Sequence, residues 1–463
     1  MNADPAHPLL SDAYRRRFIA ILFIVCFFNL ADRAVFSVLA PLIRVDLGLS
    51  DTQIGLLQGL SFALLYGGLG LPIGRLAERR SRIGIIAFAT AFWSVATVFS
   101  GAAMSFAQML LTRVGVGMGE AGFTAPTSSL VADHFPRERR ASAMSVIMLG
   151  LPIGSMVGAI GAGLIAQQWG WRAAFFAFGI PGILVALLVW RCLSDPPRGL
   201  VEGGRAAPAN IPPLSAVFSH LWNTKTLRWI VIGGAICSIG IQGVAQFMAL
   251  YFVRSFHMPI SAAAALFGLI SGIALSAGLL VGGLGTDRAS VRDPRWWVLA
   301  PAIALLVTAV CFNVGFRSPS LVVAVTLIAL GCVGAMIHYG PTVGLIQNLT
   351  PVNMRSTAAA AFAMLYALAG TGIGPTFVGF ASDRFATRAF GSGDYLAQCR
   401  PGRIAPELME RCAEAAQYGL VRALSLCVLA YAVAALFYWL ASRNLRADLQ
   451  CGDSQRAAAA LAR

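Results

Sequence analysis

Long runs of apolar residues, separated by short polar segments, recur along almost the entire chain. Each run has the length of about 20 residues that an α-helix needs to cross the hydrocarbon core of a bilayer. The pattern predicts twelve membrane-spanning helices, near residues 18–42, 53–74, 83–103, 107–131, 142–166, 173–193, 229–252, 260–284, 297–315, 321–346, 356–381 and 419–441.

One polar break is much longer than the others and covers residues 194–226. Five prolines lie within it: Pro196, Pro197, Pro208, Pro212 and Pro213. A polar, proline-rich segment is typical of a linker. We therefore predict four parts: a six-helix half over 1–193, a cytosolic linker over 194–226, a second six-helix half over 227–441 and a cytosolic tail over 442–463.

The composition favours a membrane protein and excludes several other classes. Of the 463 residues, 57% are apolar and only 12% are charged, and the mean hydropathy is +0.73. A soluble domain is about 25% charged. These values exclude a disordered chain, a collagen-like chain and a small disulfide-rich secreted module. The expected fold class is all-α integral membrane.

The formal net charge of +15 is better explained by membrane orientation than by nucleic-acid binding, because the basic residues lie between apolar runs and not on one face. Twenty-three basic residues fall on one side of the predicted membrane, against four in the short loops on the other: Arg44, Arg172, Arg254 and Arg317. Cytosolic loops carry such an excess. We therefore expect both termini in the cytoplasm and the chain in the inner (plasma) membrane. The last outer loop, 382–418, is a local exception, since it carries several arginines.

The two halves of the chain are related in sequence. Five residues around the fourth and fifth spans recur 215 positions later: Pro126, Thr127, Leu130, Pro136 and Arg140 match Pro341, Thr342, Leu345, Pro351 and Arg355. The segment 74–82 after the second span is echoed by 282–288 after the eighth. Repeated six-helix units are a transporter architecture, in which the binding site is expected near the membrane midplane between the halves.

These motifs resemble those of the major facilitator superfamily. The segment 74–82 is similar to the superfamily's loop after the second span, with Glu78 in place of an aspartate and Ser81 in place of a glycine. The glycine-rich fifth span is also similar, and in the superfamily it is associated with exporters. Asn29-Leu-Ala-Asp-Arg33 and Arg113-Val-Gly-Val-Gly-Met-Gly-Glu-Ala121 most resemble the spinster branch. That branch is associated with export of lysolipids and phosphorylated sphingoid bases.

Four ionisable residues are predicted to lie well inside the membrane: Asp32, Arg33, Arg113 and Glu120. A charged side chain at the bilayer centre costs about 2.5–3.5 kcal/mol on insertion scales, so each requires an explanation. One interpretation is a structural network of ion pairs that fixes helix register. The other, which we favour, is that Asp32 or Glu120 exchanges a proton while an arginine binds an anionic substrate group.

The second half has no acidic residue that we place at depth within its predicted spans. The offset of 215 residues takes Arg113 to Ile328 and Glu120 to Ala335, and the ionisable residue predicted at depth is His338. A cavity with one charged wall and one apolar wall suits an amphiphile with an ionic head and a long tail. Packing explains the histidine as well as proton exchange does.

We expect further substrate-binding residues on spans one, two, seven and eleven. The candidates besides the two arginines and His338 are Asn29, Gln58, Ser61, Phe62, Tyr66, Gln242, Gln246, Phe247 and Tyr366. Each of them is also compatible with ordinary helix packing.

The resemblance also implies a gate. In the superfamily, the loop after the second span acts as a latch that holds the cytosolic side shut, which here assigns Gly74, Glu78 and Arg79 to gating. Asp287 and Arg288 after the eighth span are the weaker counterpart. The positive-inside bias by itself explains the arginines but not Glu78.

Two of the nine cysteines, Cys399 and Cys412, fall in a loop predicted to lie on the outer side. Their spacing of 13 residues and an oxidising compartment favour a disulfide, which would staple the arginine-bearing loop. The other cysteines lie mostly in spans or cytosolic segments, and we assign them no chemistry.

The predicted function is a secondary transporter that moves an amphiphile, such as a lysolipid or a sphingoid phosphate, by alternating access with proton coupling. A multidrug exporter and a small organic-anion transporter are the alternatives. An intramembrane lipid enzyme is disfavoured, because the five histidines are dispersed. We expect no cofactor, no metal and no nucleic-acid partner. The expected partners are the substrate, protons and membrane lipid, and we expect a monomer.

Overall fold

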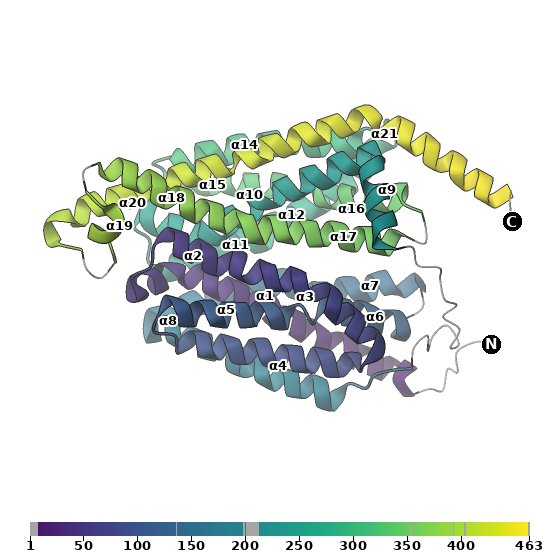
Figure 1. Cartoon of the computed structure of the whole chain (residues 1–463), viewed down its shortest axis with the longest axis horizontal. Coiled ribbons are helices and arrows are strands. Elements are labelled where there is room, and N and C mark those ends of the chain that lie inside the picture. The colour runs from purple at the N-terminus through teal and green to yellow at the C-terminus, as the bar shows by residue number, and fades with distance from the viewer. Residues whose placement is uncertain are drawn as a thin grey trace. The chain divides into compact units, whose positions relative to one another are not determined.

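The computed structural model describes residues 8–135, 137–197, 200, 213–351, 354–391, 393–401 and 404–461, and every regular element in these ranges is helical (Figure 1). The earlier helices are α1 (Asp12–Leu47), α2 (Asp51–Gln58), α3 (Leu60–Arg79), α4 (Arg82–Gly101), α5 (Phe106–Glu120), α6 (Thr124–His134), α7 (Arg137–Met148), α8 (Gly150–Cys192), α9 (Leu214–Asn223) and α10 (Lys225–Phe256). The later helices are α11 (Ile260–Leu269), α12 (Leu275–Leu280), α13 (Thr286–Ser290), α14 (Trp296–Arg317), α15 (Leu321–Met336), α16 (Tyr339–Leu349), α17 (Arg355–Ala367), α18 (Gly374–Phe390), α19 (Tyr395–Gln398), α20 (Met409–Cys427) and α21 (Leu429–Leu461). Short 3₁₀ turns are η1 (Pro8–Leu10) and η6 (Pro406–Leu408), and π-helical turns are η3 (Ile270–Ala274), η4 (Val281–Gly285) and η5 (Leu368–Ile373).

The chain forms two compact units. Unit 1 comprises Met1–Ala207, Gln246–Gly272 and Phe390–Glu414, and unit 2 comprises Pro208–Ala245, Ile273–Ala389 and Ala415–Arg463. Helix α10 therefore contributes its first part to unit 2 and its last part to unit 1. Each unit is described by itself below.

Nine helical stretches in the described residues are long and apolar enough to cross a membrane. One of them, Val146–Cys192, holds two of the predicted spans, because the chain bends at Gly170 with a φ of 81°, which glycine adopts readily. The second and fourth predicted spans are the two that remain, and each is divided into two shorter helices. The helices therefore agree with the prediction of twelve spans.

The two divided spans break next to predicted site residues. The second span breaks at Gly59, directly after Gln58, and the fourth breaks at residues 121–123, directly after Glu120. Broken helices near the midplane form the binding sites of many secondary transporters, because the interruption frees backbone groups and brings polar side chains to one place. The breaks thus give the candidate site its position along both spans.

The sequence repeat is visible in the backbone. Helix α6 covers Thr124–His134 and α16 covers Tyr339–Leu349, so both ends are displaced by 215 residues. The breaks before these helices also correspond, since α5 ends at Glu120 and α15 at Met336. The two halves of the chain therefore share the same interruption in the fourth and tenth spans.

The eleventh span is longer than the hydropathy pattern predicts. Helix α18 ends at Phe390, nine residues beyond the predicted end at 381. Asp383, which the hydropathy pattern places in the loop 382–418, therefore lies in the helix and is 5% exposed. The pattern missed this extension because Asp383, Arg384 and Arg388 lower the local hydropathy.

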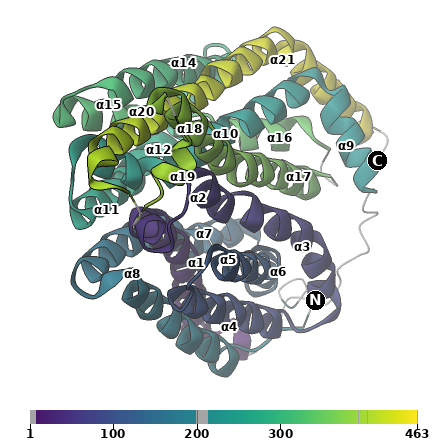
Figure 2. The same cartoon turned by 60° about the vertical axis from the view of Figure 1, so that its left-hand side comes forward.

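Helix α1 packs along α8 through small residues (Figure 2). Gly154 of α8 lies against the backbone of Phe27, and a Cβ at Gly158 would lie 2.7 Å from the Cα of Ala31. Such close helix contacts require residues with little or no side chain. This packing fixes α1 at the turn that carries Asp32.

Candidate functional site

Four buried charges of unit 1 come from two helices. Asp32 and Arg33 lie in the middle of α1, and Arg113 and Glu120 lie on α5. Asp32 and Glu120 are each 1% exposed and Arg113 is 4% exposed, whereas the side chain of Arg33 keeps 22% of its surface. The structure brings together the four residues that the sequence analysis selected, and Arg33 is the most accessible of them.

Arg33 and Glu120 form a direct ion pair. Nε of Arg33 donates to Oε2 of Glu120 at 2.6 Å, and a terminal guanidinium nitrogen contacts the same oxygen. The guanidinium carbon lies 5.1 Å from the centre of the Tyr66 ring, and Asn29 lies beside the carboxylate. Pairing of this kind makes a buried charge tolerable.

Asp32 and Arg113 are held by hydroxyl groups of α4. Oγ1 of Thr97 donates to Oδ2 of Asp32 at 3.0 Å, and Arg113 donates to Oγ of Ser100 at 2.9 Å. Sequence reasoning missed both hydroxyls. Their spacing of three residues, which places them on one face of a span, was the available signal.

Three polar atoms of this cluster have no hydrogen-bond partner among the described residues: Oδ1 of Asp32, Oε1 of Glu120 and Nε of Arg113. The guanidinium of Arg113 faces the rings of Phe36 and Phe175 instead, with centres 4.9 and 5.7 Å away. A buried polar atom without a partner costs roughly 1–3 kcal/mol. Such atoms are suited to receive a proton or a ligand group.

The predicted residues of the second span lie at the Gly59 break. Gln58 is 6% exposed, and neither polar atom of its amide has a hydrogen-bond partner in the described part of the chain. Ser61 donates to a backbone carbonyl of the preceding turn at 2.8 Å, and Tyr66 contacts Arg33 as described above. The prediction for Phe62 concerns a side chain outside the described residues.

The predicted residues of the seventh span divide between the units. Gln246 in unit 1 accepts a hydrogen bond from Ser37 of α1. Phe247 has no exposed surface, so in this structure it belongs to the packed interior of unit 1. Gln242 in unit 2 donates to Oγ1 of Thr371 at 3.2 Å.

The histidine of unit 2 lies in an aromatic cluster. His338 has no exposed surface, and its Nδ1 donates to the carbonyl of Ala335 at 2.7 Å. Its ring stacks on Tyr366, with centres 6.0 Å apart, and meets Tyr339 and Tyr438 edge-on. Nε2 of His338 and the hydroxyl of Tyr366 find no hydrogen-bond partner within the described ranges.

The predicted gate residues are only partly described. Arg79 and Arg288 are exposed, and Asp287 accepts a hydrogen bond from Nε1 of Trp297 at 3.3 Å. The predictions for Gly74 and Glu78 concern side-chain positions outside the described residues.

Arg82, at the end of the same motif, is the centre of a buried ion-pair network. It is 1% exposed and contacts the carboxylates of Asp133 and Asp195, the latter from Nε at 2.9 Å. It also donates to the carbonyl of Pro196 at 2.8 Å and to Ser129 at 3.0 Å. The sequence pattern did not single out the two acids, although each lies two residues after the predicted end of a span on the same side of the membrane as Arg82.

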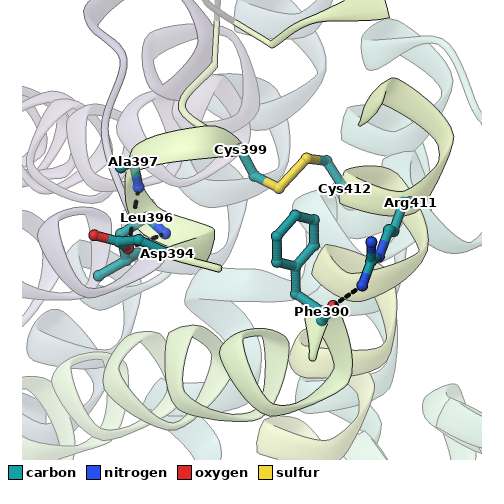
Figure 3. The surroundings of a disulfide bond; sticks show 7 residues. All are labelled: Phe390, Asp394, Leu396, Ala397, Cys399, Arg411 and Cys412. Atoms are coloured by element: carbon teal, nitrogen blue, oxygen red, sulfur yellow. Dashed lines mark hydrogen bonds between the residues drawn. A yellow bond between two sulfur atoms is a disulfide. The ribbon is translucent and has the colours of Figure 1, made fainter. Parts of the chain in front are cut away.

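A disulfide joins Cys399, directly after α19, to Cys412 in α20 (Figure 3). The carboxylate of Asp394 accepts hydrogen bonds from two backbone N–H groups in the first turn of α19. Arg411 donates to the carbonyl of Phe390 and lies 4.7 Å from the centre of its ring. The segment between the last two spans is thus tied together by one covalent bond and by local side-chain contacts.

Comparison with known proteins relates this architecture to transporters. Residues 22–375 match the model of the Major Facilitator Superfamily. An MFS-type efflux pump of Mycolicibacterium smegmatis is 31% identical over 93% of this chain and 93% of its own length. A hexuronate transporter of Bacillus subtilis is 26% identical over 80% of this chain and 88% of its own length, and Protein spinster homolog 1 of Xenopus laevis is 25% identical over 83% and 76%. The crystal structure of a bacterial homolog to the human lysosomal transporter Spinster, in an inward-facing and unoccupied conformation, matches with a TM-score of 0.87 at 29% identity, over 95% of this chain and 99% of that chain.

Proposed function

The chain belongs to the Major Facilitator Superfamily, and from this premise we propose that it moves an amphiphilic anion, such as a lysolipid or a sphingoid phosphate, across the membrane by alternating access coupled to protons. It is a multi-pass membrane transporter of the spinster branch and not an enzyme. The proposal concerns its substrate, its coupling ion and the residues that serve them.

The observation that carries the proposal is the ion pair between Arg33 and Glu120. Glu120 is almost fully buried, whereas Arg33 keeps part of its surface. An anionic head group that reaches Arg33 would compete with Glu120 for the guanidinium. A buried carboxylate that loses its cation takes up a proton, because a neutral acid is far less costly to bury than an anion. Binding of the substrate and uptake of a proton are coupled in this way.

Asp32 and Arg113 are the second acid and the second base of this mechanism. Their side chains are held by the hydroxyls of Thr97 and Ser100, and no ion pair joins them to each other within the described part of the chain. The carboxylate of Asp32 therefore has one free oxygen for a proton. Arg113 has a free Nε for an acceptor, such as a phosphate or carboxylate oxygen of the substrate.

The side chains of unit 2 favour an amphiphile over a sugar. The rings of Phe362, Tyr339 and Tyr366 contact one another around the buried His338. This cluster offers apolar surface and few hydrogen bonds, which suits an alkyl chain. We assign further substrate contacts to Asn29, Gln58, Ser61, Phe62, Tyr66, Gln242, Gln246 and Phe247.

Transport of a small organic anion is the second candidate. The similarity to a hexuronate transporter supports it, since Arg33 and Arg113 provide two guanidinium groups, and arginine binds carboxylates in a bidentate way. Export of drugs is the third, supported by the similarity to an efflux pump and by the glycines of the fifth span. We rank these two candidates below the amphiphile because the aromatic rings around His338 carry no charge that would bind a small ion.

The charge imbalance along the chain supports a topology in which the chain spans the inner membrane and both termini lie in the cytoplasm. On this topology Gly74, Glu78, Arg79, Asp287 and Arg288 lie on the cytosolic side, where we assign them to gating. We add Arg82 to this group, because its two carboxylates tie together the ends of several spans. We propose that the transporter works as a monomer.

Flux of a labelled lysolipid into proteoliposomes, with and without an imposed pH gradient, tests the proposal. We expect the gradient to stimulate flux and Glu120→Gln to abolish the stimulation. Asp46→Asn is the matched control, because Asp46 is paired with Arg172 at 2.6 Å in the same unit but is 45% exposed, and its loss should leave the stimulation intact. Flux that ignores the gradient would refute proton coupling. Flux of a sugar acid without flux of the lysolipid would favour the second candidate.

A further inference from the structure

A carboxylate at one end of unit 1 is shared by two arginines. Asp51 is the first residue of α2 and is 1% exposed. It accepts from Nε of Arg44 at 2.8 Å and from the two terminal nitrogens of Arg254 at 2.6 and 2.7 Å. We call these three residues the Asp51 clasp.

The two arginines of the clasp differ in their distance along the chain. Arg44 lies in the last turn of α1, seven residues before Asp51, whereas Arg254 lies in the last turn of α10, 203 residues after it. The contact of Arg254 is bidentate, which makes it both strong and directional. Arg44 is therefore the local partner of Asp51, and Arg254 is the remote partner.

Arg254 lies on a segment, Gln246–Gly272, that packs in unit 1 although the rest of α10 and of the eighth span belongs to unit 2. Within this segment α11 lies against α8, where Gly163 faces Ala264. Contacts between small residues allow helices to approach closely. Because Gly163 and Ala264 have no polar side-chain atoms, the two helices can also separate here without leaving a polar side chain unpaired.

The segment ends at a π-helical turn. Turn η3 covers Ile270–Ala274, and the boundary between the two units falls inside it, after Gly272. π-helical turns interrupt the regular hydrogen bonding of an α-helix and are common at functional sites and at kinks. The segment therefore has an ion pair near one end and a point suited to bending at the other.

We propose that the ion pair between Arg254 and Asp51 is a gate of the transport cycle. When the pair is formed, the segment Gln246–Gly272 lies against α1, α2 and α8 and closes this end of the molecule. When the pair breaks, the segment leaves these helices and the eighth span bends at η3. This inference rests on the alternating-access function proposed above, and on the topology proposed there the gate lies on the outer side.

The local arginine explains how such a gate opens at modest cost. Removing the only partner of a buried carboxylate would leave an uncompensated charge, which is strongly destabilising. Asp51 keeps Arg44 when Arg254 leaves, so the open state retains an ion pair. A carboxylate with one permanent and one removable cation is thus suited to switch between two states.

The test measures how fast a membrane-impermeant maleimide modifies a thiol placed on the face of the segment that packs against α8. Ala264→Cys is introduced into a chain in which every cysteine except Cys399 and Cys412 is replaced by serine; Ala264 has no exposed surface. Arg254→Gln should raise the labelling rate about fivefold or more, while Arg44→Gln should not raise it, because without Arg44 the open state would leave Asp51 without an ion pair. The two variants remove the same chemical group from the same carboxylate, so each is the control for the other.

Two outcomes would overturn the gate. One is an unchanged labelling rate in Arg254→Gln, and the other is an equal increase in both variants, which a static ion-pair network would give. If Arg254→Gln does not fold, Arg254→Lys is used, because it keeps the charge but loses the bidentate contact. Its rate should then be intermediate, and a rate equal to that of the unsubstituted chain would also overturn the proposal. The labelling requires neither a substrate nor a pH gradient, so its result is independent of the lysolipid and proton-coupling proposals.

Discussion

The break in the fourth span and the break in the tenth span lie at corresponding positions of the repeat but differ in chemistry. In unit 1 the break between α5 and α6 follows Glu120, which is paired with Arg33. In unit 2 the corresponding break between α15 and α16 contains His338, which is surrounded by tyrosine rings. The helices that follow the two breaks begin and end at positions that correspond at an offset of 215 residues.

This comparison indicates that the break itself is structural and that its side chains determine what it binds. A helix interruption exposes backbone groups in any sequence. In unit 1 it lies beside an arginine that can bind an anion and a carboxylate that can bind a proton. In unit 2 it lies beside uncharged rings, which pack against one another and offer single hydrogen-bond donors or acceptors. Changes at the two breaks should therefore have different consequences, and four predictions follow in order of expected effect.

The largest effect is expected from Arg33→Gln. This change leaves Glu120 buried without its ion pair, which should destabilise the fold by about 3–5 kcal/mol and stop transport. The apparent melting temperature of the purified protein and the lysolipid flux measure the two effects. The double variant Arg33→Gln/Glu120→Gln removes both charges and should recover most of the stability but not the gradient-driven flux. A double variant as unstable as the single one would contradict the role given to the pair.

A smaller effect is expected from Thr97→Val, which removes the hydroxyl that donates to Asp32. Hydrogen bonds to charged groups contribute about 1.5–3 kcal/mol, so the melting temperature should fall and gradient-driven flux should decrease. Thr97→Ser keeps the hydroxyl and is the matched control. If serine and valine variants behaved alike, the hydroxyl would have no role in holding Asp32.

The corresponding change in unit 2 should have a weaker effect of a different kind. His338→Phe keeps the ring between Tyr366 and Tyr438 but removes the hydrogen bond to Ala335, a loss of about 0.5–1.5 kcal/mol. Flux should still respond to the pH gradient, because no charge is lost. A His338→Phe variant that transports but ignores the gradient would show that the histidine carries the proton, and the difference between the two breaks would then disappear.

The smallest effect concerns a partly exposed carboxylate of unit 2, outside the spans. The backbone N–H of Arg295 and then the guanidinium of Arg446 hold the pKa of Asp293 below its ordinary value of 3.8. A lowered pKa in the folded state means that the contribution to stability is present above the pKa of the unfolded chain and is lost as the pH falls through the folded value. Asp293→Asn should therefore lower the melting temperature slightly near neutral pH, and it should flatten the decline of stability in acid. A large loss of stability at neutral pH would contradict this assignment.

Much of the fold could be predicted from hydropathy and from the repeat, and the exceptions have physical causes. The second and fourth spans were predicted as single runs, but Gly59 and residues 121–123 divide them. A window average of hydropathy does not register a local change of backbone angles. Asp383 was placed in a loop, yet it lies in a helix and is buried, because its neighbours in space and not those in sequence cover it.

The candidate site could be predicted in its residue types but not in its contacts. Asp32, Arg33, Arg113 and Glu120 stand out in any scan of the spans, since charge is rare in such segments. Which acid meets which arginine depends on the rotation of α1 and α5 about their axes. Spacing along one helix could not provide that information, because the ion pair joins Arg33 of α1 to Glu120 of α5.

By itself, the sequence determined the membrane location of the chain, the number of spans, the two-fold repeat and the presence of buried charges. These properties depend on the transfer of each residue between water and an apolar medium, which is a local quantity. The tertiary structure alone decided that Arg33 holds Glu120, that hydroxyls of α4 hold Asp32 and Arg113, and that Asp51 is shared by a local and a remote arginine. These contacts join residues far apart in the chain, and their geometry is set by helix packing, which depends on all the neighbouring side chains together.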